Sequence, residues 1–237
     1  MEILALLTAR GNNTLKDKNI LKVNRLPVLS YPCKEAKKVK EIKNYFVSSE
    51  DKKILDIAAK YGFKKILRPK KFARANSQHI DTLTHAISYL KKLKIKPDVI
   101  LVLLGNAPII KHDWIKKSID ILKKDKAISS VVPVLKDNDH NPYRSKKIKN
   151  GYLNNFFNFK KKNVPSNRQQ LPDSYFLAHN FWLIRTKSIL KNDGEKPWSF
   201  LGKKVKPLLI QNSIDIHHRI DLEIAKKILK TFKNSKN

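Results

Sequence analysis

The sequence predicts one α/β domain with a mainly parallel central sheet flanked by helices, and three observations point to it. The apolar runs 3–7 and 99–104 do not alternate with polar residues, which is typical of parallel strands buried on both faces. Amphipathic segments separate the apolar runs as far as residue 134, as in strand–helix–strand crossovers. A chain of 237 residues, 41% of them hydrophobic, can bury one sizeable core.

The elements are expected to alternate along the chain. Five strands are predicted, at 3–7, 45–48, 65–67, 99–104 and 130–134. The first helix is predicted over about 26–42, because its early proline is tolerated in a first turn. The second is expected after Ser49 as N-cap, with Glu50 and Asp51 in its first turn and Gly62 as its stop. Two more helices are predicted, over about 80–90 and 113–124.

Residues 136–178 interrupt this alternation. Prolines, a glycine and clustered polar residues replace the regular pattern, and 152–153 and 156–157 have the composition of short strands or hairpin pieces. Isolated hairpins are not stable alone, so we expect this segment to be an extension that serves as a dimerisation arm. The remaining elements are a return to the sheet at 181–184 and 208–210, a last helix from about 219, and a frayed tail over 233–237.

Charge and cysteine content limit the class of protein. The formal net charge is +31, and the 51 basic residues include only eight arginines. The lysines are scattered, without a basic tail or an aromatic-studded stripe, which favours a lysine-coated surface over a nucleic-acid-binding patch. Cys33 is the single cysteine, and no apolar run has membrane-spanning length. We therefore expect a soluble, cytoplasmic protein without a nucleic-acid or membrane partner; a basic nucleic-acid-binding protein stays open as the alternative.

The loop 8–19 follows the first predicted strand and is the first candidate site. It contains a glycine, three side chains that can bond to backbone, and three cations: Gly11; Asn12, Asn13 and Thr14; Arg10, Lys16 and Lys18. Loops at the carboxyl ends of parallel strands are where open α/β sheets bind ligands. Inward-pointing amides and cations are the ingredients of a phosphate cradle, although such a loop can also be a plain surface connection.

Three more loops are expected at the same edge of the sheet, at 68–79, 105–108 and 213–221. Asp215 and His217 lie two residues apart, so on an extended segment they share a face and could both contact one metal ion. Mg²⁺ prefers oxygen ligands, which makes Asp215 the better ligand. Asp221 is interpreted as a carboxylate in the first turn of the last helix.

These residues carry a resemblance to the acylneuraminate cytidylyltransferase family. The similar motifs follow the family's order and spacing over nearly the whole chain: the opening strand with Ala9-Arg10-Gly11 and Lys18-Asn19, Val47-Ser48-Ser49-Glu50, Ile54 with Ala58-Ala59-Lys60-Tyr61-Gly62, Leu67-Arg68-Pro69, Ser130-Val131-Val132, Arg168-Gln169-Gln170-Leu171-Pro172, and Asp215-Ile216 with Asp221. Each motif alone is weak evidence for the family, and the combination is specific to it.

The resemblance implies a Rossmann-like nucleotidyltransferase fold and a homodimer in which 136–178 packs across subunits. It implies CTP and an acidic nine-carbon sugar (a sialic-, legionaminic- or pseudaminic-acid-like nonulosonic acid) as substrates, with Mg²⁺ as cofactor. The implied catalytic residues are Arg10, Lys18 and Asp215. The implied nucleotide-binding residues are Ala9, Arg10, Gly11, Asn12, Lys16, Lys18, Asn19, Arg68, Ser77 and His79. The implied sugar-binding residues are Asn106, Arg144, Arg168, Gln169 and Tyr175, and the implied metal ligands are Asp215 and His217.

The chain departs from the family pattern at four places. The cradle loop is one residue short, Gly105–Ile109 replaces Gln-Pro-Thr-Ser-Pro, Ala178–Phe181 replaces the segment with Asn-Gly-Ala, and His217 replaces an aspartate. The residues expected to bind the nucleotide therefore match the family pattern better than those expected to bind the sugar. A Kdo-type or other sugar nucleotidyltransferase, and an inactive family member, stay open as alternatives, and no general base is assigned.

Overall fold

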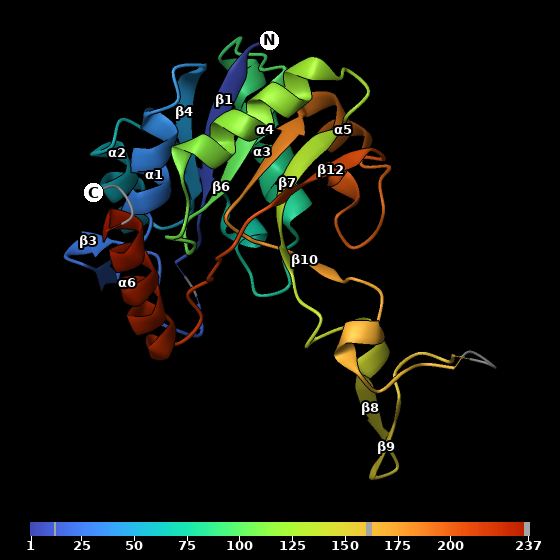
Figure 1. Cartoon of the computed structure of the whole chain (residues 1–237). Helices are drawn as coiled ribbons and strands as arrows, with labels where there is room; N and C mark the ends of the chain where they lie inside the picture. Colours follow the sequence, from blue (N-terminus) through green and yellow to red (C-terminus); the bar gives the residue numbers. More distant parts are fainter. Residues whose placement is uncertain (12, 160–162, 235–237) are drawn as a thin grey trace.

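The computed structural model describes residues 1–11, 13–159 and 163–234, and an eight-stranded sheet forms its centre (Figure 1). The strand order is β10-β7-β11-β6-β1-β4-β5, and β12 also pairs with β7. The strands are β1 (Ile3–Thr8), β4 (Ile42–Ser49), β5 (Lys64–Leu67), β6 (Val99–Leu104), β7 (Ser130–Lys136), β10 (Tyr175–Leu177), β11 (Phe181–Arg185) and β12 (Val205–Leu209). Strands β6, β1, β4 and β5 run parallel, β12 runs parallel to β7, and β10 and β11 are antiparallel to their neighbours. The mainly parallel sheet is thus confirmed.

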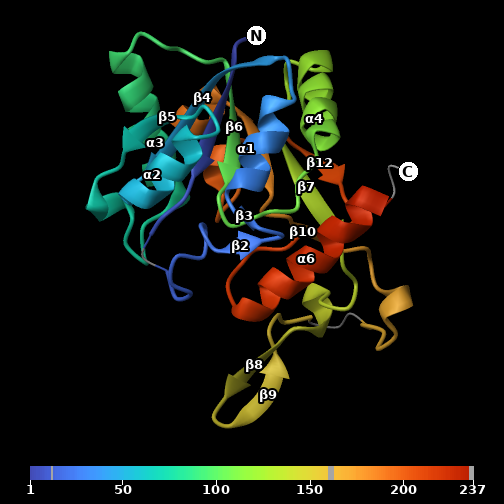
Figure 2. The same cartoon turned by 90° about the vertical axis from the view of Figure 1, so that its left-hand side faces the viewer.

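Helices cover both faces of the sheet, as Figures 1 and 2 show. One layer contains α1 (Ser30–Lys37), α2 (Lys52–Ala59) and α4 (His112–Lys124), and the other contains α3 (His79–Lys92) and α5 (Thr186–Lys191). Successive residues of β1 serve the two layers in turn: Ala5 packs in the first and Leu6 in the second. A strand buried on both faces needs apolar residues at every position, which explains the unbroken run 3–7.

Two predicted helix starts are wrong. Leu26–Pro27 (β3) pairs with Lys22–Val23 (β2) in a small antiparallel ribbon, and α1 begins only at Ser30. The predicted end of this helix near residue 42 is also wrong, because α1 ends at Lys37 and Ile42 begins β4. At the second helix, Ser49 ends β4, and the N-cap is Asp51, whose carboxylate accepts the amide of Lys53 at 2.8 Å. In both cases, strand pairing in the folded protein sets the boundary of the element, whereas the local sequence is compatible with several boundaries.

The segment after β7 forms an arm that projects from the body (Figure 1). Its hairpin consists of β8 (Lys146–Lys149) and β9 (Tyr152–Asn155), which pair only with each other among the described residues. Phe156 and Phe157 lie just beyond these strands, and the amide of Phe156 donates to the carbonyl of Ser145 at 3.2 Å, so Phe156 is a piece of the hairpin and not of a strand. Both ends of the predicted extension belong to the central sheet, since β7 runs to Lys136 and β10 pairs with it. Short 3₁₀ turns occur at Lys70–Phe72, Pro142–Arg144, Arg168–Gln170 and Ser199–Leu201.

The last helix, α6 (Arg219–Asn234), packs beside the β2–β3 ribbon, as both views show (Figures 1 and 2). Its Ala225 joins a third apolar cluster with Val23 and Val28 of the ribbon region and Ile216 of the preceding loop. The predicted frayed tail overlaps the end of α6, and residues 235–237 lie outside the described residues. No helix in the described part of the chain is both long and apolar enough to cross a membrane.

Candidate active site

The carboxyl ends of β1, β5 and β6 open into one cavity of about 430 Å³. Loops after each of these strands contribute to its wall, together with the segment that leads into α6. Ten of the residues proposed from the sequence line it: Ala9, Arg10, Lys18, Asn19, Arg68, Ser77, His79, Asn106, Asp215 and His217. The four loops that were expected at one edge of the sheet therefore do meet there, as the positions of these residues show.

Side-chain amides hold the cradle loop (residues 8–19) in shape. The side chain of Asn19 is buried and donates to the carbonyl of Arg10 at 2.8 Å, and Asn13 donates to the same carbonyl at 2.6 Å. The carbonyl of Asn19 accepts the amide of Leu29 at the start of α1. The loop is therefore tied both to itself and to the body of the domain.

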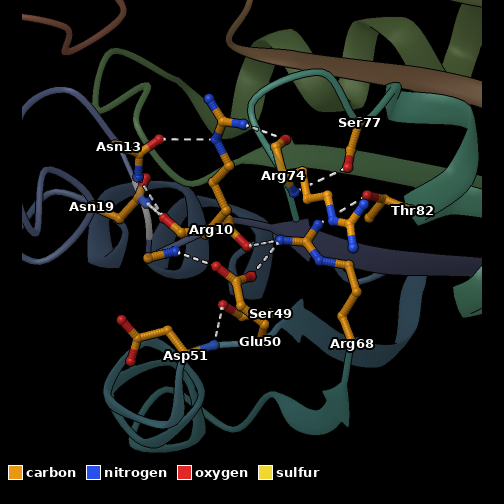
Figure 3. Close-up of polar contacts among 12 residues, drawn as sticks. Arg10, Asn13, Asn19, Ser49, Glu50, Asp51, Arg68, Arg74, Ser77 and Thr82 are labelled. Atoms are coloured by element: carbon orange, nitrogen blue, oxygen red, sulfur yellow. Dashed lines mark hydrogen bonds and ion pairs between the residues drawn. The ribbon is translucent and has the colours of Figure 1, made fainter. Parts of the chain in front are cut away.

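The Arg10 guanidinium bridges two loops at the cavity, as Figure 3 shows. Its Nε donates to the Asn13 side chain at 3.1 Å, and one terminal nitrogen donates to the backbone carbonyl of Arg74 at 2.7 Å. Ser77 Oγ in turn accepts the amide of Arg74 at 3.0 Å. Arg10 thus connects the cradle loop with the loop between β5 and α3.

Glu50 and Arg68 form a buried ion pair beneath the loop, with an Arg68 terminal nitrogen 2.9 Å from Glu50 Oε2. Burial lowers the pKa of Arg68, against the hydrogen bond and charge of Glu50. Burial also acts to raise the pKa of Glu50, but hydrogen bonds from Arg68 and the Gly11 amide outweigh it and hold that pKa below its usual value. The prediction that Glu50 sits in the first turn of α2 is wrong, because α2 begins at Lys52.

Lys18 and Asp215 both line the cavity, and their charges interact. Burial raises the pKa of Asp215 to about 7, Lys18 acts against this rise, and Asp221 adds to it. Burial likewise lowers the pKa of Lys18, with Asp215 opposing. Asp215 Oδ1 is buried without a hydrogen-bond partner. A buried carboxylate oxygen without a partner is costly to keep charged, so the site suits a cation.

Backbone contacts fix the Asp215 segment. The amide of Ile216 donates to the carbonyl of Asn106 at 2.9 Å, which places Asp215 beside the exit of β6. His217 Nε2 lies 3.8 Å from Asp215 Oδ2. Asp221 lies in the first turn of α6 as predicted, and it accepts the amides of His217 and His218, both at 2.7 Å.

Two histidines form an uncharged part of the wall. Burial, with His179 and the charges of Arg68 and Arg10 adding to it, lowers the pKa of His79 to about 4. Burial also lowers the pKa of His179. The two imidazole rings pack edge-on against Trp182 at centroid distances of 5.1 and 5.7 Å. The His79 side chain lines the cavity. Because its pKa is well below 7, it is uncharged at neutral pH and can offer the cavity only a hydrogen bond.

The sequence profile of the cytidylyltransferase family matches residues 4–190. The chain belongs to this family. It is therefore a nucleotidyltransferase enzyme, and the resemblance to the cytidylyltransferase family found in the sequence is confirmed.

Relatives of this cytidylyltransferase include proteins named for acidic sugars. It is 27% identical over 236 residues to CMP-N,N'-diacetyllegionaminic acid synthase of Legionella pneumophila, with 97% of each chain covered. It is 24% identical over 217 residues to the pseudaminic acid cytidylyltransferase and UDP-2,4-diacetamido-2,4,6-trideoxy-beta-L-altropyranose hydrolase of Helicobacter pylori. That match covers 90% of this chain and 38% of the longer relative. The solved CMP:2-keto-3-deoxy-manno-octonic acid synthetase with CTP has a TM-score of 0.69 at 14% identity, covering 98% of this chain and 99% of that one, which confirms the fold.

Several residues proposed from the sequence do not line the cavity of the enzyme. Arg144, Arg168, Gln169 and Tyr175 lie on the arm or at its base, and both arginines are held by Asp139. Lys16 is exposed, and the Gly11 amide donates to Glu50 at 2.7 Å. Asn12 lies outside the described residues.

Asn13, which the sequence placed in the cradle loop, also lines the cavity. Other lining residues were given no role by the sequence reasoning, among them Phe72, Arg74 and His179. His179 precedes β11, which runs antiparallel to β6, so the start of β11 meets the carboxyl end of β6. That orientation is the signal that would have placed His179 at the site, and local sequence does not reveal it.

Proposed function

We propose that the enzyme transfers CMP from CTP to the anomeric hydroxyl of a nonulosonic acid, with release of pyrophosphate and dependence on Mg²⁺. The observation that carries this proposal is one cavity in a cytidylyltransferase that combines Arg10 and Lys18 with Asp215, whose Oδ1 has no hydrogen-bond partner. Two cations suit a triphosphate, and a carboxylate with one buried, unpartnered oxygen suits a divalent ion.

The reaction requires positioning and charge more than covalent chemistry. The sugar hydroxyl would attack the α-phosphorus in line with the departing pyrophosphate, and negative charge would build on the phosphate oxygens. Arg10 and Lys18 would bind the triphosphate and stabilise that charge. Asn19, Ser77 and His79 would contact the cytidine, and His79, being neutral, would donate or accept a hydrogen bond without repelling Lys18.

Asp215 fits the Mg²⁺ that the reaction calls for. Its Oδ1 is buried without a partner, and His217 lies alongside as a second donor. When bound, the ion would supply positive charge to the phosphate oxygens. Lys18 acts against the burial that raises the pKa of Asp215 to about 7, and so favours the ionised form of the carboxylate that a bound ion would need.

The acidic sugar would be recognised with help from the arm of a second copy. Arginine is suited to a carboxylate because its fork can bind both oxygens. Arg144 and Arg168 of one chain lie on the arm and do not line that chain's own cavity. A homodimer in which each arm reaches the other subunit would bring such arginines to the sugar, and the relatives' names support a nonulosonic acid as that sugar.

A pyrophosphate-release assay tests the proposal. CTP and Mg²⁺ are supplied with sialic, legionaminic, pseudaminic or Kdo acid, and one of the three nine-carbon acids is expected to give the highest kcat/KM. The Arg10→Ala variant should lose at least about a hundredfold in kcat/KM, because a cation at the developing charge is removed. Lys96→Ala, at an exposed position away from the cavity, is the matched control and should match wild type. Turnover confined to Kdo, or full activity of Arg10→Ala, would contradict the proposal.

A further inference from the structure

Two side chains of different chemistry meet where the segment before α6 borders the cavity. Asp215 has carboxylate oxygens, of which Oδ1 is buried without a hydrogen-bond partner. His217 has an imidazole ring, whose Nε2 lies 3.8 Å from Asp215 Oδ2. Both residues line the cavity. These two residues, here called the mixed donor pair, therefore present oxygen and nitrogen ligands to the same space.

The residue between them fixes the direction of the pair. Ile216 is buried in the third apolar cluster, and its amide donates to the carbonyl of Asn106 at 2.9 Å. The amide of His217 donates to Asp221 Oδ2 at 2.7 Å. The backbone is thus held on both sides of the pair, while the His217 side chain is 59% exposed. A change of that side chain therefore leaves the apolar clusters intact.

The pair has little further negative charge around it. Asp221 Oδ2 is already occupied by the amides of His217 and His218. Within the described part of the chain, no three histidine, cysteine or acidic side chains are placed to share a metal ion. The positive charge of Lys18 also offsets part of the charge of Asp215. An ion at the pair would therefore gain one partly balanced carboxylate and one imidazole from the protein, and phosphates and water would complete its coordination.

This donor set does not suit all divalent ions equally. Mg²⁺ prefers oxygen ligands and is held largely by their negative charge. Imidazole nitrogen suits divalent ions of the first transition row, and the affinity of a mixed site rises from Mn²⁺ through Fe²⁺ to Co²⁺. The His217 nitrogen would therefore add more to the binding of these ions than to the binding of Mg²⁺.

We propose that the mixed donor pair selects a divalent transition-metal ion over Mg²⁺, and that His217 is the ligand that sets this selection. The inference rests on the proposed function, in which CTP fills the cavity and its phosphates share the ion. Mg²⁺ still supports the transfer, at a higher concentration than the preferred ion. The family pattern has an aspartate in place of His217, so the nitrogen ligand is a property of this chain.

The relative affinity for Co²⁺ and Mg²⁺ tests the selection. The Kd of each ion is measured for the enzyme–CTP complex without acceptor sugar, in wild type, His217→Asp and His217→Ala. The ratio of the Mg²⁺ Kd to the Co²⁺ Kd should fall at least about tenfold in both variants, because even a group that only supports a ligand is worth that much in metal affinity. His218→Ala, a neighbouring exposed histidine that does not line the cavity, is the matched control and should keep the wild-type ratio. An unchanged ratio in His217→Asp would overturn the proposal.

Pulsed EPR of bound Mn²⁺ gives a readout that a merely structural role of His217 would not move. Wild type should show coupling of the ion to a directly bound nitrogen. Labelling the histidines with ¹⁵N should change that coupling, which distinguishes an imidazole nitrogen from a cytosine nitrogen. The signal should be lost in His217→Asp and His217→Ala and kept in His218→Ala. Absence of histidine coupling in wild type would contradict the proposal, whatever the affinities.

Failure of this inference is distinguishable from failure of the proposed function. Calorimetry with CTP and Mg²⁺ is carried out first, and a wild type that binds no CTP would contradict the proposed function. The selection is then tested with Mn²⁺ and the protein alone, where histidine coupling that disappears in His217→Ala would support it and absence of coupling would overturn it. If CTP binds but no histidine coupling is seen, the inference alone is wrong.

Discussion

At the scale of single residues, Glu35 links two helices through its carboxylate. It lies in α1 and accepts the amide and the ring Nδ1 of His112, at 2.9 and 2.8 Å, where α4 begins. It also accepts from Lys38. Burial acts to raise the pKa of Glu35, but the hydrogen bonds from Lys38 and His112 outweigh it and hold the pKa below its usual value.

This shift predicts a pH-dependent contribution to stability. A carboxylate with a depressed pKa in the folded state stabilises the fold above its unfolded pKa, and the contribution is lost as pH falls through the folded pKa. Glu35→Gln should therefore lower the free energy of unfolding at pH 7 by about 1 kcal/mol or less, since solvent screens this partly exposed group. The difference should shrink as pH falls below the ordinary carboxyl pKa, and vanish once the carboxyl is also protonated in the folded protein. Urea unfolding at several pH values measures it, and a difference that grows in acid would contradict it.

At the scale of elements, the sequence was most informative where burial is complete. β1 and β6 were placed correctly because strands covered on both faces are apolar throughout. The sequence does not predict the β2–β3 ribbon because each of its strands is only two residues long. The strands form because they pair with each other and pack under α6. Likewise, Asp51 and Ser49 are both acceptable N-caps locally, and the length of β4 decides between them.

The start of α3 carries a prediction about catalysis, because it presents His79 to the cavity. Asp81 accepts the amide of Gln78 at 3.1 Å and so closes the first turn. Asp81→Ala should cost about 1 kcal/mol of stability and raise the KM for CTP a few-fold with little change in kcat. Asp113→Ala, in the first turn of α4 away from the cavity, is the control and should leave KM unchanged. Equal KM values for the two variants would show that the turn does not position the site.

At the scale of the whole molecule, the arm exposes apolar side chains that would stay in contact with water if the hairpin had no partner. Ile148, Tyr152 and Leu153 are each about three-quarters exposed. The proposed dimer would cover them and bring the arm arginines to the partner's sugar site. Leu153→Glu should therefore sediment as a monomer, lose sugar turnover and retain CTP affinity. Analytical ultracentrifugation and calorimetry check this, and a monomeric wild type with full turnover would contradict it.

The sequence predicts where several residues of the candidate site lie, but not which groups they contact. Strand exits can be read from local sequence, which predicts Arg10 and Asp215 at one edge of the sheet, and both line the cavity there. What local sequence does not contain is the partner of each group. Glu50 was interpreted as a helix-dipole residue because its ion pair with Arg68 exists only after β4 and β5 lie side by side.

The cavity also has a consequence for the order of folding. It joins the loop after β1 to the segment before α6, and α6 packs on the ribbon that follows the same loop. Contacts between segments so far apart along the chain are slow to form, because a long loop must close before any of them is gained. Binding competence should thus appear late in refolding, after the interior strands are protected. A fluorescent CTP analogue added during refolding would report completion of the fold itself.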